Sequence, residues 1–197
     1  MPATDDEIRE KYLERAIREL NHFTRELQTC DRCPRGNLMP VLGSGHPQAD
    51  IVLCKYAPTP AEIEEGVAFY GRAGQAVLKS LERLKVDPLS VYGTNCLKFA
   101  GQRVAQACSF LTRELHIVQP KLVVAMGEDT LRFVNELRFP LADEVEARPG
   151  ELQRFTPTID ALVVPDIDAS LDEQAKKTEF WNALKALGPW WAELPPY

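Results

Sequence analysis

Residues 50–54 read Asp-Ile-Val-Leu-Cys, a short apolar run that follows the turn-forming stretch from Gly43 to Pro47. Apolar runs of this length between turn residues are typical of buried strands. Similar runs occur at residues 91–99, 121–126 and 162–164, and helical apolar spacing occurs at residues 74–85, 103–118, 129–137 and 171–187. The alternation predicts an α/β fold, a three-layer α/β/α sandwich with a central, mainly parallel four-stranded sheet.

The two ends of the chain differ in pattern. An amphipathic helix is predicted over residues 4–28, with Thr4 and Glu7 as a capping box. Its apolar face consists of Ile8, Leu13, Ile17, Leu20, Phe23 and Leu27. Residues 188–197 contain two consecutive prolines, so we expect an irregular tail in which Trp190 and Trp191 cover a helix face.

The composition favours one globular domain over residues 1–197, because a single core serves chains of up to roughly 250 residues. No run is long enough to span a bilayer, and the polar, acidic segment from Met1 to Glu10 is unlike a secretory signal. We therefore expect a cytoplasmic monomer that does not enter membranes. The net charge of −6 argues against broad affinity for nucleic acid but leaves room for a local basic groove.

Several motifs occur in a fixed order along the chain. They are Cys30-Asp31-Arg32-Cys33-Pro34, Leu42-Gly43-Ser44-Gly45-His46-Pro47, Ala57-Pro58 followed by Phe69-Tyr70-Gly71-Arg72-Ala73-Gly74, Thr94-Asn95, Gln119 to Gly127, and Val164-Pro165. In order and spacing they resemble the uracil-DNA glycosylase superfamily, and family 4, the iron-sulfur type, most closely. The resemblance implies a DNA-repair fold that binds a flipped base and releases it from its sugar.

The resemblance also implies how the base is held. Phe69 corresponds to the aromatic residue that stacks on the base, beside Ala57 and Pro58, and the alternative is a loop residue that plugs the core. Asn95 corresponds to the amide that pairs with the N3 donor and the O4 acceptor of uracil, and the alternative is a residue that ends a strand.

Both catalytic positions of the family are replaced. The family motif is Gly-Glu-Ala-Pro-Gly, but this chain reads Lys55-Tyr56-Ala57-Pro58-Thr59, so Tyr56 stands where the water-activating Glu is expected. Val164 stands where a His donates to the departing base, and loss of such a donor typically costs on the order of 10²-fold in rate. We therefore predict weak or absent excision of ordinary uracil. The bulky Lys55 and Tyr56 either narrow the pocket or change which base enters it, and the alternative is drift at a site that is no longer used.

Other residues could supply the missing chemistry or contact DNA. Asp166, just past the lost His, is the best substitute carboxylate; Glu62, Glu64 and Glu65 are further acids in the first loop, and the alternative is that all are solvated. Basic residues fall in or beside the expected pocket loops, either to contact DNA phosphates or as ordinary surface charges. They are Lys55, Arg72, Lys98 and Arg103.

The five cysteines suit thiols or metal ligands better than disulfides in a reducing compartment. The resemblance implies a four-iron, four-sulfur cluster, for which Cys30, Cys33 and Cys108 match three ligands. Phe99 occupies the fourth position, and Cys96 is a candidate relocated ligand, although residues 96 and 99 of a regular strand face opposite ways. The alternative is that the cluster is lost and these cysteines pack as small apolar residues, as we expect of Cys54.

Three functions remain open from the sequence. The first is a divergent glycosylase-like protein with weak or absent uracil excision. The second is an enzyme of altered specificity, a DNA glycosylase or nucleoside hydrolase that uses Asp166 or a loop Glu. The third is a non-catalytic module that binds nucleic acid or a nucleotide.

Overall fold

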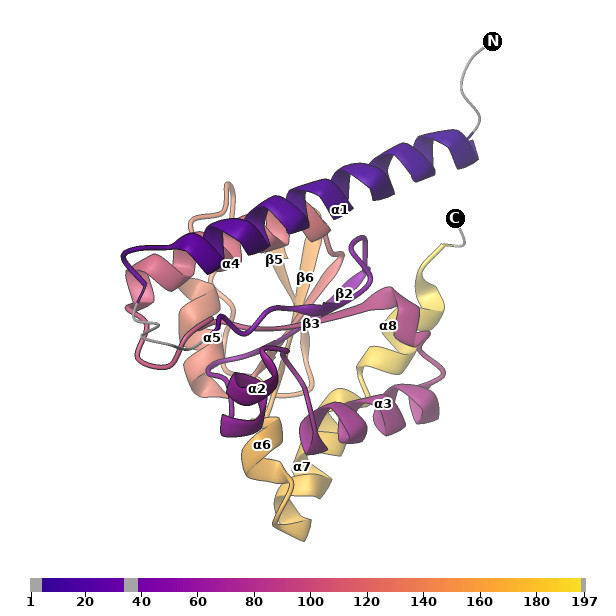
Figure 1. Cartoon of the computed structure of the whole chain (residues 1–197). Coiled ribbons are helices and arrows are strands. Elements are labelled where there is room, and N and C mark those ends of the chain that lie inside the picture. Colours follow the sequence, from indigo (N-terminus) through magenta and orange to yellow (C-terminus); the bar gives the residue numbers. More distant parts are fainter. Residues whose placement is uncertain (1–4, 34–38, 196–197) are drawn as a thin grey trace.

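The structure is a computed structural model and describes residues 5–33 and 39–195 (Figure 1). A six-stranded sheet runs through the centre in the order β1-β3-β2-β4-β6-β5. The strands are β1 (Ser44–Gly45), β2 (Ile51–Lys55), β3 (Val91–Asn95), β4 (Leu122–Met126), β5 (Leu152–Thr156) and β6 (Ile159–Val164). The four central strands are parallel to one another, and β1 and β5 pair antiparallel at the two edges. The predicted fold class is confirmed.

The sequence pattern missed the two edge strands, so the predicted number of strands was wrong. β1 has only two residues, and neither is apolar. β5 reads Leu-Gln-Arg-Phe-Thr and buries only its last two residues, so it has no continuous apolar run. Edge strands are commonly short or polar because one side of them is not paired.

Helices cover both faces of the sheet (Figure 1). They are α1 (Asp5–Thr29), α2 (Pro60–Glu65), α3 (Arg72–Leu84), α4 (Val104–Val118), α5 (Glu128–Asn135), α6 (Ile167–Ser170), α7 (Gln174–Leu184) and α8 (Leu187–Glu193), with a 3-10 turn at Pro88–Ser90. One core lies between the sheet and α4 and α5, and a second lies between the sheet and α3, α7 and α8. Val52 and Cys54 of β2 enter the first core, whereas Ile51 and Leu53 enter the second, as strand alternation requires.

Helix α1 confirms the predicted N-terminal helix and packs on α4, but its apolar face is only partly used. Ala16, Phe23 and Leu27 are buried in a third cluster, whereas Ile8 and Ile17 are exposed. The N-terminal part of α1 extends beyond the rest of the fold (Figure 1). Thr4 of the predicted capping box lies outside the described residues. Within residues 5–33 and 39–195, no helix combines the length and apolarity needed to cross a membrane.

The C-terminal tail was predicted wrongly. Residues 187–193 form helix α8, with Pro189 in the first turn, where a missing backbone N–H costs nothing. The expectation that Trp190 covers apolar structure is confirmed, because it is buried against the α3 and α7 side of the sheet, and its Nε1 donates to Asp160 at 3.0 Å. Trp191 packs more loosely against the same core.

The last residues of the four parallel strands lie side by side and position the site; we call these four residues the row. Asn95 of β3 pairs with Lys55 of β2, Lys55 with Met126 of β4, and Met126 with Val164 of β6. All four residues are buried. Leu53, Met126 and Val164 belong to the core on the α3 and α7 side, so strand alternation directs the whole row to that face.

Candidate base-binding site at the carboxyl edge of the sheet

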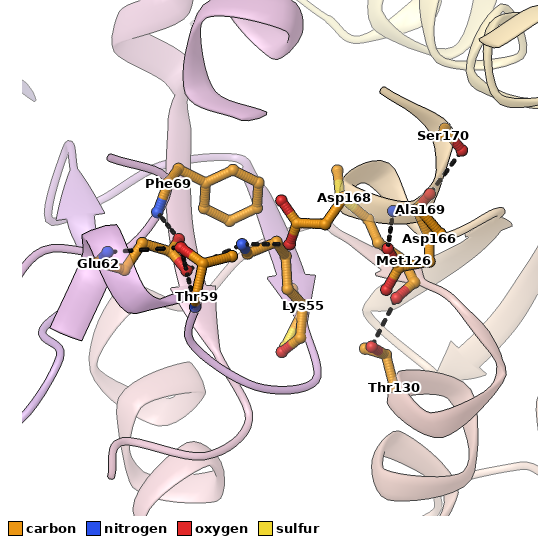
Figure 2. Close-up of polar contacts among 11 residues, drawn as sticks. Lys55, Thr59, Glu62, Phe69, Met126, Thr130, Asp166, Asp168, Ala169 and Ser170 are labelled. Atoms are coloured by element: carbon orange, nitrogen blue, oxygen red, sulfur yellow. Dashed lines mark hydrogen bonds and ion pairs between the residues drawn. The ribbon is translucent and has the colours of Figure 1, made fainter. Parts of the chain in front are cut away.

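A buried lysine stands in the middle of this row. Lys55 is 1% exposed, and its Nζ lies 2.9 Å from Glu62 Oε2 and 2.7 Å from Asp168 Oδ2 (Figure 2). The same nitrogen is 5.3 Å from the centre of the Phe69 ring, within the range of a cation–π contact. Two carboxylates and a ring compensate for the loss of hydration that burial imposes on an ammonium group.

Glu62 is fixed by the local sequence around it. Thr59 is the N-cap of α2, Pro60 is its first residue, and Glu62 completes a capping box with the backbone and hydroxyl of Thr59. Its second oxygen accepts a short hydrogen bond from Phe69 N. With Lys55, four donors converge on a fully buried carboxylate. The Thr-x-x-Glu spacing carried this signal in the sequence, where Glu62 was considered only as a catalytic or solvated acid.

Phe69 is held in a constrained conformation by its neighbours. Its φ is 61°, in the left-handed region that non-glycine residues seldom adopt. Its ring packs on Gly93, where an added Cβ would lie only 2.7 Å from Phe69 Cδ2, so no larger residue fits there without a shift. The ring therefore lies against the row, in contact with β3 and close to the Lys55 ammonium group.

Asn95 is the polar residue of the row that lacks partners. Its side chain is fully buried, and neither Oδ1 nor Nδ2 has a hydrogen-bond partner within the described residues. An unsatisfied buried polar group costs about 1–3 kcal/mol, so such groups usually serve a ligand or an ordered water. An amide can bind a planar ring edge that presents an acceptor beside a donor.

The two replaced catalytic positions lie on opposite faces of the sheet. Val164 ends the row and packs in the α3 and α7 core, with no polar side-chain group. Tyr56 packs against the other core, where its ring contacts Phe133 edge to face at 6.3 Å. The expectation that Tyr56 narrows the pocket is wrong, whereas the Lys55 side chain does lie next to the Phe69 ring.

The two acids after β6 have different environments. Asp166 caps α6, since its Oδ1 accepts from Ala169 N at 2.8 Å, and its carbonyl oxygen accepts from Ser170. Figure 2 shows this group apart from the Lys55 contacts. Asp168 instead reaches Lys55 and keeps a side chain that is 33% exposed. The sequence favours Asp166 as the substitute carboxylate, but Asp168 is the acid that contacts Lys55.

Two of the four predicted DNA contacts are wrong. Lys55 and Lys98 are both buried, so neither ammonium group can reach a phosphate. Lys98 Nζ lies 2.5 Å from Glu114 Oε2 and makes a short contact with Thr94 Oγ1. Arg72 and Arg103 are exposed, as such contacts require, although Arg72 forms an ion pair with Asp172 at 2.6 Å. Their contacts with DNA stay predictions.

The predicted cluster ligands are not brought together. Cys30 and Cys33 form a disulfide beside α1, contrary to the expectation of thiols or metal ligands. Cys96 lies in the α4 and α5 core, with its Sγ 3.4 Å from Cys54 Sγ, and Cys108 packs against that core. Burial raises the pKa of the Cys96 thiol well above its usual value. The four cysteines therefore do not fit one iron-sulfur cluster.

The reason for this separation is the end of strand β3. The predicted strand over residues 91–99 ends at Asn95, although Cys96 N still donates to Lys55 O at 2.7 Å. Cys96 thus faces the same core as Cys54, while Phe99 belongs to the α1 cluster. Among residues 5–33 and 39–195, no three His, Cys, Asp or Glu side chains lie close enough to hold a metal ion.

Comparisons with known proteins identify the family of this chain and several relatives. Residues 42–187 match the family model of the uracil DNA glycosylase superfamily. A type-4 uracil-DNA glycosylase of Archaeoglobus fulgidus is 24% identical over 187 residues, which cover 87% of this chain and 93% of that protein. A type-4 uracil-DNA glycosylase of Pyrobaculum aerophilum is 29% identical over 131 residues, covering 60% of this chain and 66% of that protein.

Proposed function

We propose, because this chain belongs to the uracil DNA glycosylase superfamily, that it binds a nucleobase but excises ordinary uracil weakly or not at all. The single observation that carries the proposal is the buried Lys55 ammonium group beside Phe69. A base that stacked on this ring would have to displace a charge paired with two carboxylates. Separating buried, paired charges is costly, so the pocket is closed to a base unless the Lys55 side chain moves.

The side chains around the row offer little help to the chemical step. Cleavage of the glycosidic bond leaves negative charge on the base, which a donor in the site must stabilise. Val164 supplies none, and the charge of Lys55 is already balanced by Glu62 and Asp168. Tyr56 points into the opposite core and is not placed to activate water.

The unpaired amide of Asn95 supports retention of base binding. Its oxygen and nitrogen are buried beside the Lys55 and Phe69 contacts. A pyrimidine edge with adjacent donor and acceptor atoms would satisfy both of them. If Lys55 swings aside, such an edge can reach Asn95 while the base ring meets Phe69.

Excision assays test this proposal. The purified chain is incubated with single-stranded DNA containing uracil and with a U:G duplex, and cleavage is measured after alkali. We expect no release above that of an Asn95→Ala variant. Rapid release that Asn95→Ala abolishes would contradict the proposal, since it would show an open and competent site.

A second candidate function is a glycosylase or nucleoside hydrolase of altered specificity. The exposure of the Asp168 carboxylate favours it, because this acid lies at the row and still reaches solvent. Glu62 is less suitable, since four donors already occupy its carboxylate. A panel of damaged bases and free nucleosides tests this function. Release that is lost in Asp168→Asn and retained in Asp166→Asn supports it, whereas no release across the panel favours a binding module.

A further inference from the structure

We propose that Cys30 and Cys33 form a reversible dithiol–disulfide pair in place of the metal cluster that the family resemblance implies. The two cysteines are bonded to each other in the structure, with their Cα atoms 5.5 Å apart. They lie directly after the last residue of α1, on the side of the fold that α1 shares with α4. The proposal does not depend on the activity of the carboxyl-edge site.

Two other side chains lie next to this pair, which borders a surface cavity. Gln106 Nε2, on α4, lies 3.5 Å from Cys30 Sγ and 3.3 Å from Cys33 Sγ, so its amide donates to both sulfurs. Phe99 is buried in the same apolar cluster as the two cysteines. A thiolate cluster needs further Cys ligands beside such a pair, and neither Gln106 nor Phe99 binds iron in such a site.

The remaining cysteines cannot replace those ligands. Cys96 and Cys54 are buried in the core between the sheet and α4, and Cys108 packs against that core. Cys108 lies two residues after Gln106 and lines a surface cavity together with Thr112 and Glu136, whereas Cys30 and Gln106 line another. Residues two apart on a helix do not share a face, so Cys108 is directed away from the Cys30–Cys33 pair.

The exposure of the two cysteine residues indicates which of them reacts first. Cys30 is partly exposed, whereas Cys33 is only 8% exposed. In the reduced chain, the Cys30 thiolate attacks a small-molecule disulfide and releases one thiol, leaving a mixed disulfide. The Cys33 thiolate then attacks the Cys30 sulfur and displaces the second thiol. Two electrons pass to the small molecule, and both cysteine protons leave with its thiols or solvent.

The oxidised pair closes the turn that follows α1, next to α4. The disulfide closes the turn after Thr29, and Gln106 joins both sulfurs to the first half of α4. Phe99 and Leu27 pack in the same cluster. Reduction removes the covalent closure but leaves the apolar packing, so the switch changes the local constraint and not the fold.

The first experiment tests whether the cluster is absent. The full chain is purified without oxygen from cells supplied with iron, and bound iron and visible absorbance are measured. We expect less than one iron atom per chain and no broad visible band. About four iron atoms per chain, lost in Cys30→Ser, would overturn the proposal.

The second experiment tests the redox pair itself. The chain is equilibrated with graded ratios of reduced and oxidised glutathione, quenched in acid, denatured and labelled with a maleimide polymer. We expect the labelled cysteines to fall from five to three on oxidation, as one step. Cys108→Ser, the matched control, keeps the step, and Cys30→Ser and Cys33→Ser each lose it.

Peptide mass mapping of the oxidised wild-type chain decides the outcome without any variant. A Cys30–Cys33 bond supports the proposal. A Cys54–Cys96 bond, which the 3.4 Å contact of those sulfurs also permits, would overturn it. No change in labelling across the whole range of ratios would overturn it as well.

Discussion

Two buried lysines lie near the carboxyl ends of neighbouring strands, and their surroundings differ. Lys98 belongs to a closed network on the α4 side, in which Glu114 accepts from Tyr92, Thr94 and Lys98. All four residues are buried. Lys55, on the α3 and α7 side, shares its charge with an acid that is one-third exposed, next to an Asn95 with no partner in the described part of the chain.

The difference distinguishes a structural ion pair, Lys98 with Glu114, from an ion pair at a candidate binding site, Lys55 with Asp168. A buried polar network in which every group is satisfied rigidifies the core and leaves nothing for a ligand to bind. A buried ion pair that reaches solvent and adjoins an unsatisfied amide can change its partners. Lys98 therefore joins β3 to α4, whereas Lys55, as we propose, controls access to Asn95.

The largest effect is expected from breaking the closed network. Glu114→Gln leaves the Lys98 ammonium group buried without a counter-charge, and we expect a loss of about 3–5 kcal/mol in the free energy of unfolding. Urea denaturation measures it. The double variant Lys98→Met with Glu114→Gln should recover much of the loss. A cost below about 1 kcal/mol for the single variant would mean that the network is not closed.

Breaking the Lys55 contacts should cost less stability than breaking the Lys98 network, and it should increase the binding of a base. Lys55→Met leaves Glu62 with three other donors and Asp168 in contact with water, so we expect a loss of about 1–3 kcal/mol. The same change removes the charge beside Phe69. Free uracil should then raise the melting temperature of Lys55→Met more than that of the wild type, and Asn95→Ala in the same background should remove this gain. Equal shifts in wild type and Lys55→Met would show that Lys55 does not close the site.

Local patterns predicted the frame of the molecule but not the partners of its charges. Apolar runs located the parallel strands. Residues 96 and 99 do lie in different clusters, but the reason is that β3 ends at Asn95 and not that a regular strand alternates its faces there. The burial of Lys55 depends on Asp168, which is 113 residues away in the chain, so no local pattern carries it. Lys98 and Glu114 are similarly joined only by the packing of α4 on the sheet. The sequence therefore misassigned both lysines, and the role of Asn95 in base binding stays a prediction.

A smaller effect is expected in the pH dependence of stability, which Tyr92 of the closed network influences. Burial, followed by the neighbouring Glu114 charge, raises the pKa of Tyr92 well above its usual value. The folded chain therefore keeps a proton that the unfolded chain releases, so this stability is complete below about pH 10 and falls as the pH rises further. Tyr92→Phe should cost about 1 kcal/mol near neutral pH and show a shallower decline above pH 10, as followed by urea midpoints. Parallel curves for the two chains would contradict the burial of this phenol.

The smallest effect is expected from a surface ion pair near the site, Arg72 with Asp172, and concerns the binding of DNA. Arg72 pairs with Asp172 on the surface, and the hydrogen bond from its guanidinium group holds the pKa of that carboxyl below its usual value. Asp172→Asn should leave stability unchanged, because exposed pairs contribute little, and should free Arg72 for phosphate. We expect single-stranded DNA to bind about two- to fivefold more tightly at low salt, with the gain lost at high salt. Glu151→Gln removes an equal charge from another exposed ion pair, with Arg148. If both variants gain equally, the net charge explains the effect, whereas a gain confined to Asp172→Asn assigns it to Arg72 at the start of α3, three residues from Phe69.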